Sequence, residues 1–284
     1  MLNNFKLLTL FAALTALLMF TGYSIGGSGG LFMSLIMSIF MQGIAYWNSD
    51  KIALAMNGAE EITENDNPKL FQMTKDLAEK AALPMPKLYI TRDPSPNAFA
   101  TGRDPEHSAV AVTEGLLRIL NDDEVRGVIA HELGHIKNRD VFISTVAAII
   151  AGTISSLVQF AFLFSSHHQH HDEEGENSGL LGFIPVLLTS LVAPILAMII
   201  QMMISRSREY EADATAAEIT QRPDALASAL LKISDTVHHQ PQPELLKPAF
   251  SSLYIANPFS GDALKEIFST HPPIEKRVDR LLRN

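Results

Sequence analysis

Long uncharged apolar runs alternate with mixed polar segments along this chain. Residues 7–20 and 31–47 form one pair of apolar runs, joined by a short Gly- and Ser-rich stretch. Residues 141–164 and 180–204 form a second pair, joined by the polar residues 165–179. A helix needs about 20 apolar residues to cross the hydrocarbon core of a bilayer. The pattern therefore predicts about four transmembrane helices, arranged as two hairpins.

Two of these features also have interpretations without a membrane. The first run could be a cleaved signal peptide, and the second pair could be a buried hairpin of a soluble domain. A signal peptide is disfavoured because a second apolar run follows the first at once, and Phe20-Thr21-Gly22 is a poor cleavage site. Membrane insertion of the second pair is favoured because each of its runs holds more than 20 uncharged residues. Tyr46 and Trp47 would then anchor the second run at the membrane interface.

The basic residues that flank the four runs all fall on one side of the predicted membrane. They are Lys6, Lys51, Lys137, Arg139, Arg206 and Arg208. Residues 165–179, on the other side, carry several carboxylates but no Lys or Arg. Because Lys and Arg mark the cytoplasmic side, we expect a multi-pass protein with both termini in the cytoplasm.

The segments outside the hairpins carry the patterns of a small soluble domain. Apolar residues at helical spacing predict helices over residues 67–83, 114–120, 223–238 and 273–282. Residues 87–91 and 98–101 are predicted as short strands, and an alternating pattern predicts a third strand over residues 108–113. The expected fold class is therefore mostly α with a small β-sheet. The expected order is hairpin, soluble part, hairpin, soluble part: residues 1–47, 48–140, 141–204 and 205–284.

Composition excludes several kinds of chemistry. The 284-residue chain has a net charge of −9, which gives a nucleic-acid partner no electrostatic support. It contains no cysteine, so disulfides, thiolate metal ligands and a cysteine nucleophile are excluded. A metal site in this chain would have to use His, Glu and Asp.

The sequence His131-Glu132-Leu133-Gly134-His135 offers such ligands. Residues four apart share one face of a helix, so His131 and His135 can each give an imidazole to one zinc ion. Glu132 points elsewhere, where its carboxylate could take a proton from water activated by the metal. The alternative is two surface histidines on an amphipathic helix, which leaves Glu132 unexplained.

Local signals place this motif on a helix. Asn121 and Glu124 have the spacing of a capping box, and acidic residues fill the first turn. Apolar residues then recur at helical spacing and predict a buried stripe: Val125, Val128, Ile129, Leu133 and Ile136. The two histidines therefore lie beside the apolar face.

A carboxylate pair follows about seventy residues later. Glu209 and Asp213 are four apart and share a helical face, whereas Glu211 points elsewhere. A catalytic zinc takes three protein ligands and an open position, and His, His and Glu are one such set. Asp213 could hold the second ring nitrogen of a ligating histidine. The alternative is a charged surface helix with contacts between its own turns.

A histidine cluster lies between the second pair of apolar runs, at His167, His168, His170 and His171. With the neighbouring carboxylates it could bind metal. A solvated connector is favoured because no hydrophobic scaffold would fix these side chains, and we assign the cluster no role.

Four stretches together resemble the HtpX family of bacterial membrane zinc metallopeptidases, which are similar to CAAX prenyl proteases. They are His131 to His135, Ser205 to Asp213, Asn97 to Gly102 and Thr270 to Pro273. The resemblance extends over nearly the whole chain. It implies an α+β zincin-like catalytic domain beside the transmembrane helices, in the bacterial inner (plasma) membrane with the active site facing the cytoplasm.

The resemblance also implies roles for particular residues. One Zn2+ per chain would be held by His131, His135 and Glu209, with Glu132 as general base and Asp213 orienting a ligand. Substrate would lie along an edge strand, where a peptide gains main-chain hydrogen bonds; this strand holds Asn97, Ala98, Phe99 and Ala100. His271 and Arg277 would lie near the zinc as oxyanion or substrate contacts. On the sequence alone, residues 97–102 could equally form an ordinary strand-to-turn corner, and His271 could be a helix-entry residue.

The expected function is a membrane zinc endopeptidase that degrades misfolded membrane proteins. Its expected partners are polypeptide substrates, the lipid bilayer and other membrane quality-control proteases, with no nucleic acid. Three alternatives stay open: a CAAX-type prenyl-protein protease, a non-proteolytic membrane metal-binding or transport protein, and a secreted soluble metallopeptidase.

Overall fold

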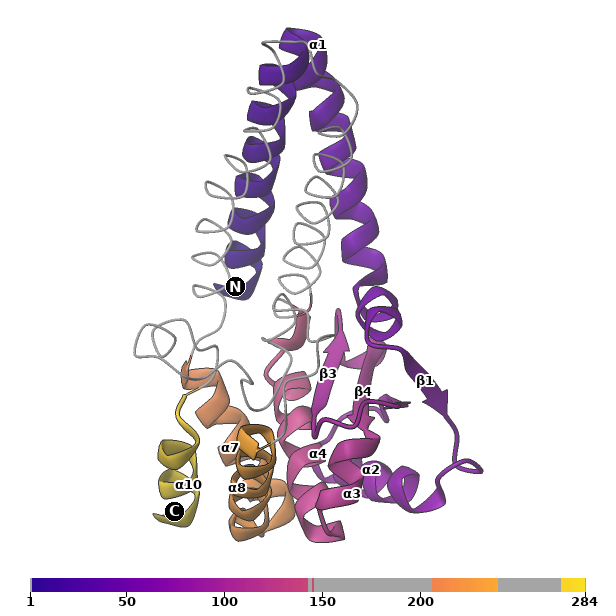
Figure 1. Cartoon of the computed structure of the whole chain (residues 1–284), viewed down its shortest axis with the longest axis vertical. Coiled ribbons are helices and arrows are strands. Elements are labelled where there is room, and N and C mark those ends of the chain that lie inside the picture. Colours follow the sequence, from indigo (N-terminus) through magenta and orange to yellow (C-terminus); the bar gives the residue numbers. More distant parts are fainter. Residues whose placement is uncertain (1, 143–144, 146–205, 240–271, 284) are drawn as a thin grey trace, which may run out of the picture.

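The computed structural model describes residues 2–142, 145, 206–239 and 272–283 (Figure 1). Apart from residues 141, 142 and 145, the second predicted hairpin lies outside these ranges, and so do its histidine cluster and His271. A long helical arm, α1 (Leu2–Met56), projects from a compact body that holds all the other described elements.

The two N-terminal apolar runs form one helical element that reverses direction in its middle. The backbone leaves helical geometry at Gly26 and Gly27, and Gly27 has a φ of 57°. The two arms lie side by side, where the Oγ1 of Thr15 is 3.0 Å from the Oγ of Ser38 and accepts a hydrogen bond of 2.8 Å from Gln42. The Gly- and Ser-rich stretch, predicted as a linker, is thus helical apart from the bend.

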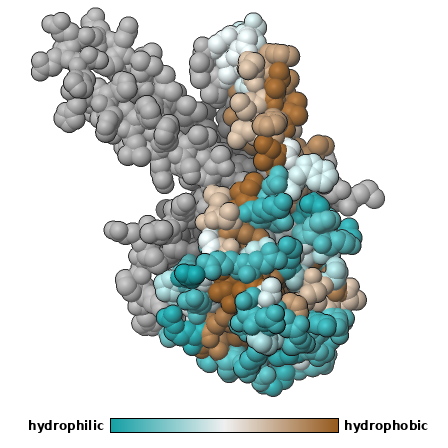
Figure 2. Space-filling model, turned by 90° about the vertical axis from the view of Figure 1, so that its right-hand side faces the viewer, coloured by the Kyte–Doolittle hydropathy of each residue, from teal (hydrophilic) through white to brown (hydrophobic). Residues whose placement is uncertain are grey.

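The second arm of α1 has a largely apolar surface. Large side chains are exposed along the second arm, including Phe32, Met33, Ile36, Ile39 and Phe40. Figure 2 shows this arm as a mostly apolar projection above a mostly hydrophilic body. Within the described ranges, one stretch is long and apolar enough to cross a membrane, Gly26–Ile44.

The body contains a four-stranded mixed sheet in the order β1-β2-β4-β3. Its strands are β1 (Ala59–Ile62), β2 (Lys87–Thr91), β3 (Ala98–Gly102) and β4 (Ser108–Thr113). β2 runs parallel to β4, and β3 pairs antiparallel with β4 at the end of the strand order. The three predicted strands are confirmed. β1 was not predicted, because its sequence Ala-Glu-Glu-Ile has no alternation of apolar and polar residues.

The helices of the body also follow the predicted pattern. They are α2 (Pro68–Lys80), α3 (Glu114–Ile119), α4 (Asp122–Lys137), α7 (Arg206–Thr220), α8 (Pro223–His239) and α10 (Ile274–Arg283). A 3-10 turn, Pro105–His107, joins β3 to β4. The chain is mostly helical with a small mixed sheet, as predicted.

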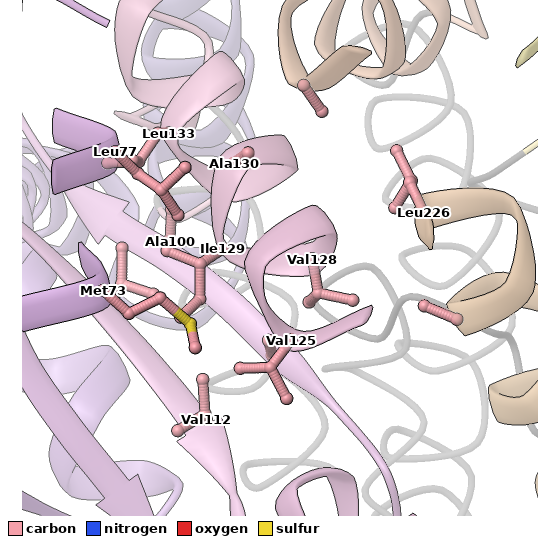
Figure 3. Close-up of a cluster of buried hydrophobic side chains, with 14 of the residues drawn as sticks. Met73, Leu77, Ala100, Val112, Val125, Val128, Ile129, Ala130, Leu133 and Leu226 are labelled. Carbon is pink, nitrogen blue, oxygen red and sulfur yellow. The ribbon is translucent and has the colours of Figure 1, made fainter. Parts of the chain in front are cut away.

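Helix α4 is the centre of the body. The predicted capping box is present, since the Asn121 side chain accepts from the Glu124 N–H at 3.0 Å and the Glu124 carboxylate accepts from the Asn121 N–H at 2.8 Å. All five residues of the predicted stripe are buried. Figure 3 shows four of the stripe residues, Val125, Val128, Ile129 and Leu133, with α2 and the sheet on one side and α8 on the other.

Candidate metal centre

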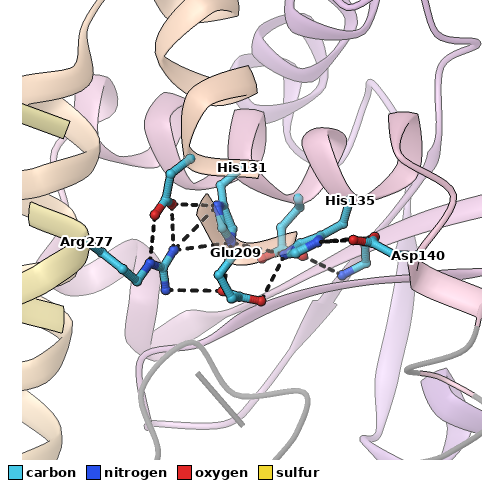
Figure 4. A network of polar contacts seen from close by, with 8 residues as sticks. His131, His135, Asp140, Glu209 and Arg277 are labelled. Carbon is cyan, nitrogen blue, oxygen red and sulfur yellow. Dashed lines mark hydrogen bonds and ion pairs between the residues drawn. The ribbon is translucent and has the colours of Figure 1, made fainter. Parts of the chain in front are cut away.

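The two histidines of α4 point toward each other. The Nε2 atoms of His131 and His135 are 3.2 Å apart, and His131 is only 3% exposed. Glu209 of α7 lies opposite, with its carboxylate oxygens 3.7 Å from the Nε2 of His131 and 3.5 Å from that of His135 (Figure 4). One ligand atom from each of the three residues lies within 4.8 Å of the others.

A close helix crossing puts Glu209 there. A Cβ atom added to Gly134 would lie 3.0 Å from the Cα of Ala212, so glycine lets α7 approach the motif helix. Ala212 is buried, and Glu209 and Asp213 lie on the same face of α7 beside it. The carboxylate pair predicted from spacing therefore meets the histidine pair.

Each histidine has a carboxylate at its other ring nitrogen. The Nδ1 of His131 is 3.0 Å from Asp213, as the sequence suggested. The Nδ1 of His135 is 3.2 Å from both oxygens of Asp140, which the sequence analysis missed. A carboxylate at Nδ1 fixes the ring and leaves Nε2 for a metal.

This donor set fits a divalent cation. Two imidazole nitrogens and a carboxylate oxygen converge in a buried space, and they are ligand types that zinc takes in catalytic sites. Burial lowers the pKa of His131, which favours the neutral form that binds metal. Burial also acts to lower the pKa of His135, but Asp140 and Glu209 outweigh it and raise that pKa to about 10. A cation would replace this proton.

Arg277 of α10 is buried behind the histidines and is 0% exposed. Its guanidinium donates to both oxygens of Asp213, at 2.9 and 2.7 Å, and its Nη1 lies 3.4 Å from Glu209. Burial acts to raise the pKa of Asp213, but Arg277 and His131 outweigh it and lower that pKa to about 2. Arg277 therefore fixes the carboxylate of Asp213, which in turn contacts the ring of His131.

Glu132 is 5% exposed and lies against the edge strand. Its carboxylate accepts a hydrogen bond of 2.8 Å from the backbone N–H of Ala100 in β3. Burial raises the pKa of Glu132 to about 7, with a further contribution from the negative charge of Glu209. A carboxyl group with such a pKa can both accept and release a proton near neutral pH.

The remaining predicted substrate residues have structural contacts. Asn97 is joined through its backbone to Thr113, with both hydrogen bonds at 2.9 Å. Phe99 packs on Leu54 of α1, whereas Ala98 and Ala100 face the main core. All four residues are buried, so their side chains are not exposed as a substrate surface.

A helix that carries two histidines and a buried glutamate, beside a carboxylate from a second helix, defines a metal-dependent peptidase. Residues 64–284 match Peptidase family M48. A protease HtpX homolog of Syntrophobacter fumaroxidans is 45% identical over 282 residues, 98% of both chains. A homolog of the same name from Pelotomaculum thermopropionicum is 49% identical over 99% of this chain and 98% of its own. One from Pyrococcus furiosus is also 49% identical, over 96% of this chain and 92% of its own.

The chain belongs to peptidase family M48, and the predicted resemblance to the HtpX proteases is confirmed. It is a membrane metalloprotease, and the family implies a catalytic metal. The fold is also similar to the crystal structure of S. mikatae Ste24p, with a TM-score of 0.52 and 18% identity. That alignment covers 97% of this chain and 64% of the other.

Proposed function

We propose that the chain is a zinc-dependent endopeptidase in which His131, His135 and Glu209 hold one zinc ion. The convergence of two Nε2 atoms 3.2 Å apart with the Glu209 carboxylate carries this proposal. Zinc is favoured because the donors are imidazole and carboxylate in a buried site, and two histidines with one glutamate are an established catalytic set.

Zinc in this site would lower the pKa of water and polarise the scissile carbonyl group. Glu132 would accept the proton from the attacking water and pass it to the leaving amine. The Ala100 N–H fixes this carboxylate while it does so. Asp213, held by Arg277, would keep the His131 ring in one orientation. An oxyanion contact by His271 remains a prediction from the resemblance.

We place the peptide substrate along β3. This strand ends the strand order, and its Ala100 N–H already reaches the Glu132 carboxylate, so a scissile bond beside it would be near the base. Because the residues of β3 are buried, this binding requires the strand's outer edge to be uncovered. The role of Arg277 is better explained by its contacts with Asp213 and Glu209 than by substrate contact.

For the membrane arrangement we keep the order predicted from the sequence. Two transmembrane hairpins, residues 1–47 and 141–204, would alternate with the two parts of the peptidase domain, residues 48–140 and 205–284. The exposed apolar surface of α1 and the basic flanks of the apolar runs support about four spans with the active site in the cytoplasm. Misfolded proteins of the bacterial inner membrane are then the expected substrates. Other quality-control proteases of the membrane are expected partners.

Glu132→Gln tests the proposed chemistry. In detergent-purified protein we expect a full zinc content and a casein cleavage rate reduced by at least about 100-fold, because only the proton acceptor is removed. Glu211→Gln is the matched control, since Glu211 is an exposed residue of α7, and it should cleave normally. Unchanged cleavage by Glu132→Gln would refute the mechanism. A comparison of prenylated and unmodified peptides separates this function from a prenyl-protein protease.

A further inference from the structure

Asp140 has no part in the chemistry described above, yet it is a buried carboxylate at the metal centre. It is 3% exposed, and both of its oxygens lie 3.2 Å from the Nδ1 of His135 (Figure 4). This arrangement mirrors the contact of Asp213 with His131 at 3.0 Å. Asp213 comes from α7, 82 residues after His131 in the sequence, whereas Asp140 follows His135 by five.

The backbone at the end of α4 explains how Asp140, only five residues after His135, can reach the His135 ring. The helix ends at Lys137, and Arg139 has a φ of 57°, in the left-handed region that glycine usually occupies. The Arg139 N–H donates to the carbonyl of Ile136 at 3.1 Å, and the Asp140 N–H donates to that of His135 at 3.3 Å. This turn reverses the chain and brings the Asp140 side chain over the last turn of the helix.

The residues after the turn are fixed as well. Phe142 packs edge-on against Tyr46 of α1 with ring centroids 5.0 Å apart. The hydroxyl of Thr145 lies 3.2 Å from that of Thr101 in β3. The turn at Arg139 is thus held between the motif helix on one side and contacts with α1 and β3 on the other.

We propose that Asp140 is a positioning residue for His135, and that the left-handed turn at Arg139 aims its carboxylate. By accepting from Nδ1, Asp140 holds the ring so that Nε2 faces the metal position and makes the imidazole a better ligand. The inference rests on the proposed function, because it takes His135 as a metal ligand.

Asp140→Asn and Asp140→Ala test the carboxylate. Zinc affinity is measured by chelator competition. The ligand geometry is followed in the Co2+-substituted protein by its visible absorption spectrum, which does not depend on cleavage. Both variants should bind zinc about 10- to 100-fold more weakly, with an altered cobalt spectrum. Asp104→Asn is the matched control because Asp104 lies 2.6 Å from the Nδ1 of His107, an Asp–His pair outside the site, and it should match the parent.

Arg139→Val and Arg139→Gly test the turn with Asp140 intact. Glycine adopts a positive φ without cost, whereas a β-branched residue there is strained. The glycine variant should keep the parent affinity and the valine variant should lose affinity, although both lack the Arg139 side chain. Equal affinities in these two variants would overturn the role of the turn.

His135→Ala separates failure of this inference from failure of the proposed function. If His135→Ala loses zinc while both Asp140 variants keep the parent affinity and spectrum, the positioning role is wrong and the metal site stands. If His135→Ala itself binds zinc as the parent does, the ligand assignment is wrong and this inference falls with it.

Discussion

Gly134 of α4 lies in close contact with Ala212 of α7, beside the metal centre. A Cβ atom on Gly134 would lie 3.0 Å from the Cα and 3.1 Å from the carbonyl oxygen of Ala212. In α7, Glu209 lies one turn before Ala212, and Asp213 follows Ala212 directly. The glycine inside the motif therefore fixes how far the third ligand stands from the two histidines.

Gly134→Ala should push α7 away from the histidines. The added methyl meets backbone, so we expect a loss of about 1–3 kcal/mol in unfolding free energy and weaker zinc binding. Gly127→Ala is the matched control, because its Cβ would lie equally close, 3.0 Å, to Leu226 of α8. It should lose stability but keep its zinc affinity. Equal zinc affinities in both variants would show that the crossing does not set the ligand distance.

Arg277→Met should strongly destabilise the metal-free protein. The change leaves Asp213 and Glu209 buried without their guanidinium partner, at a cost of about 3–5 kcal/mol. Arg283→Met, on the same helix, breaks an exposed pair with Asp279 and should change the unfolding free energy little. Chemical unfolding measures the free energy of unfolding of both variants. Equally small losses in the two would contradict the claim that Arg277 stabilises the buried carboxylates.

Local signals explain which parts of the molecule could be predicted. The capping box and apolar stripe of α4 act within a few turns, so the sequence was sufficient for the helix and for the shared face of His131 and His135. The spacing of four residues was also sufficient to predict that Glu209 and Asp213 share one face of a helix. Asp140 could not be found in this way, because Arg139 gives no sign that it adopts a positive φ.

Long-range contacts lay beyond the sequence signals. The resemblance pointed to Arg277, but its ion pair with Asp213 joins residues 64 apart and appears only when α10 packs on α7. β1 was missed because its stability comes from pairing with β2, and its two glutamates face Lys87, Tyr89 and Arg92 in exposed contacts.

Glu124 should make stability depend on pH. Burial acts to raise its pKa, but Lys232, Ser228 and the Asn121 N–H outweigh burial and lower it below 4.5. The stabilisation is therefore present above the unfolded pKa and is lost as pH falls through the folded pKa. In metal-free protein, Glu124→Gln should cost about 1–2 kcal/mol near pH 7. The difference in unfolding free energy between variant and parent should disappear in acid. A difference that does not depend on pH would contradict this prediction.

Trp47 should report the membrane interface. It is the chain's one tryptophan, is 62% exposed and lies 5.3 Å from the guanidinium carbon of Arg103. Aromatic side chains of this kind sit at the level of lipid headgroups. In proteoliposomes, a nitroxide near the headgroups should quench its fluorescence more than one at the acyl-chain end. Quenching by aqueous iodide with none from either lipid probe would place Trp47 away from the bilayer.

Glu209→Gln tests the central claim most directly. The substitution keeps the size of the side chain but removes the charged oxygen donor from the group of His131, His135 and Glu209. Zinc content after dialysis against a chelator and casein cleavage are measured on the same preparation. Loss of both is the predicted result. Normal zinc content together with normal cleavage would remove Glu209 from the ligand set and contradict the account.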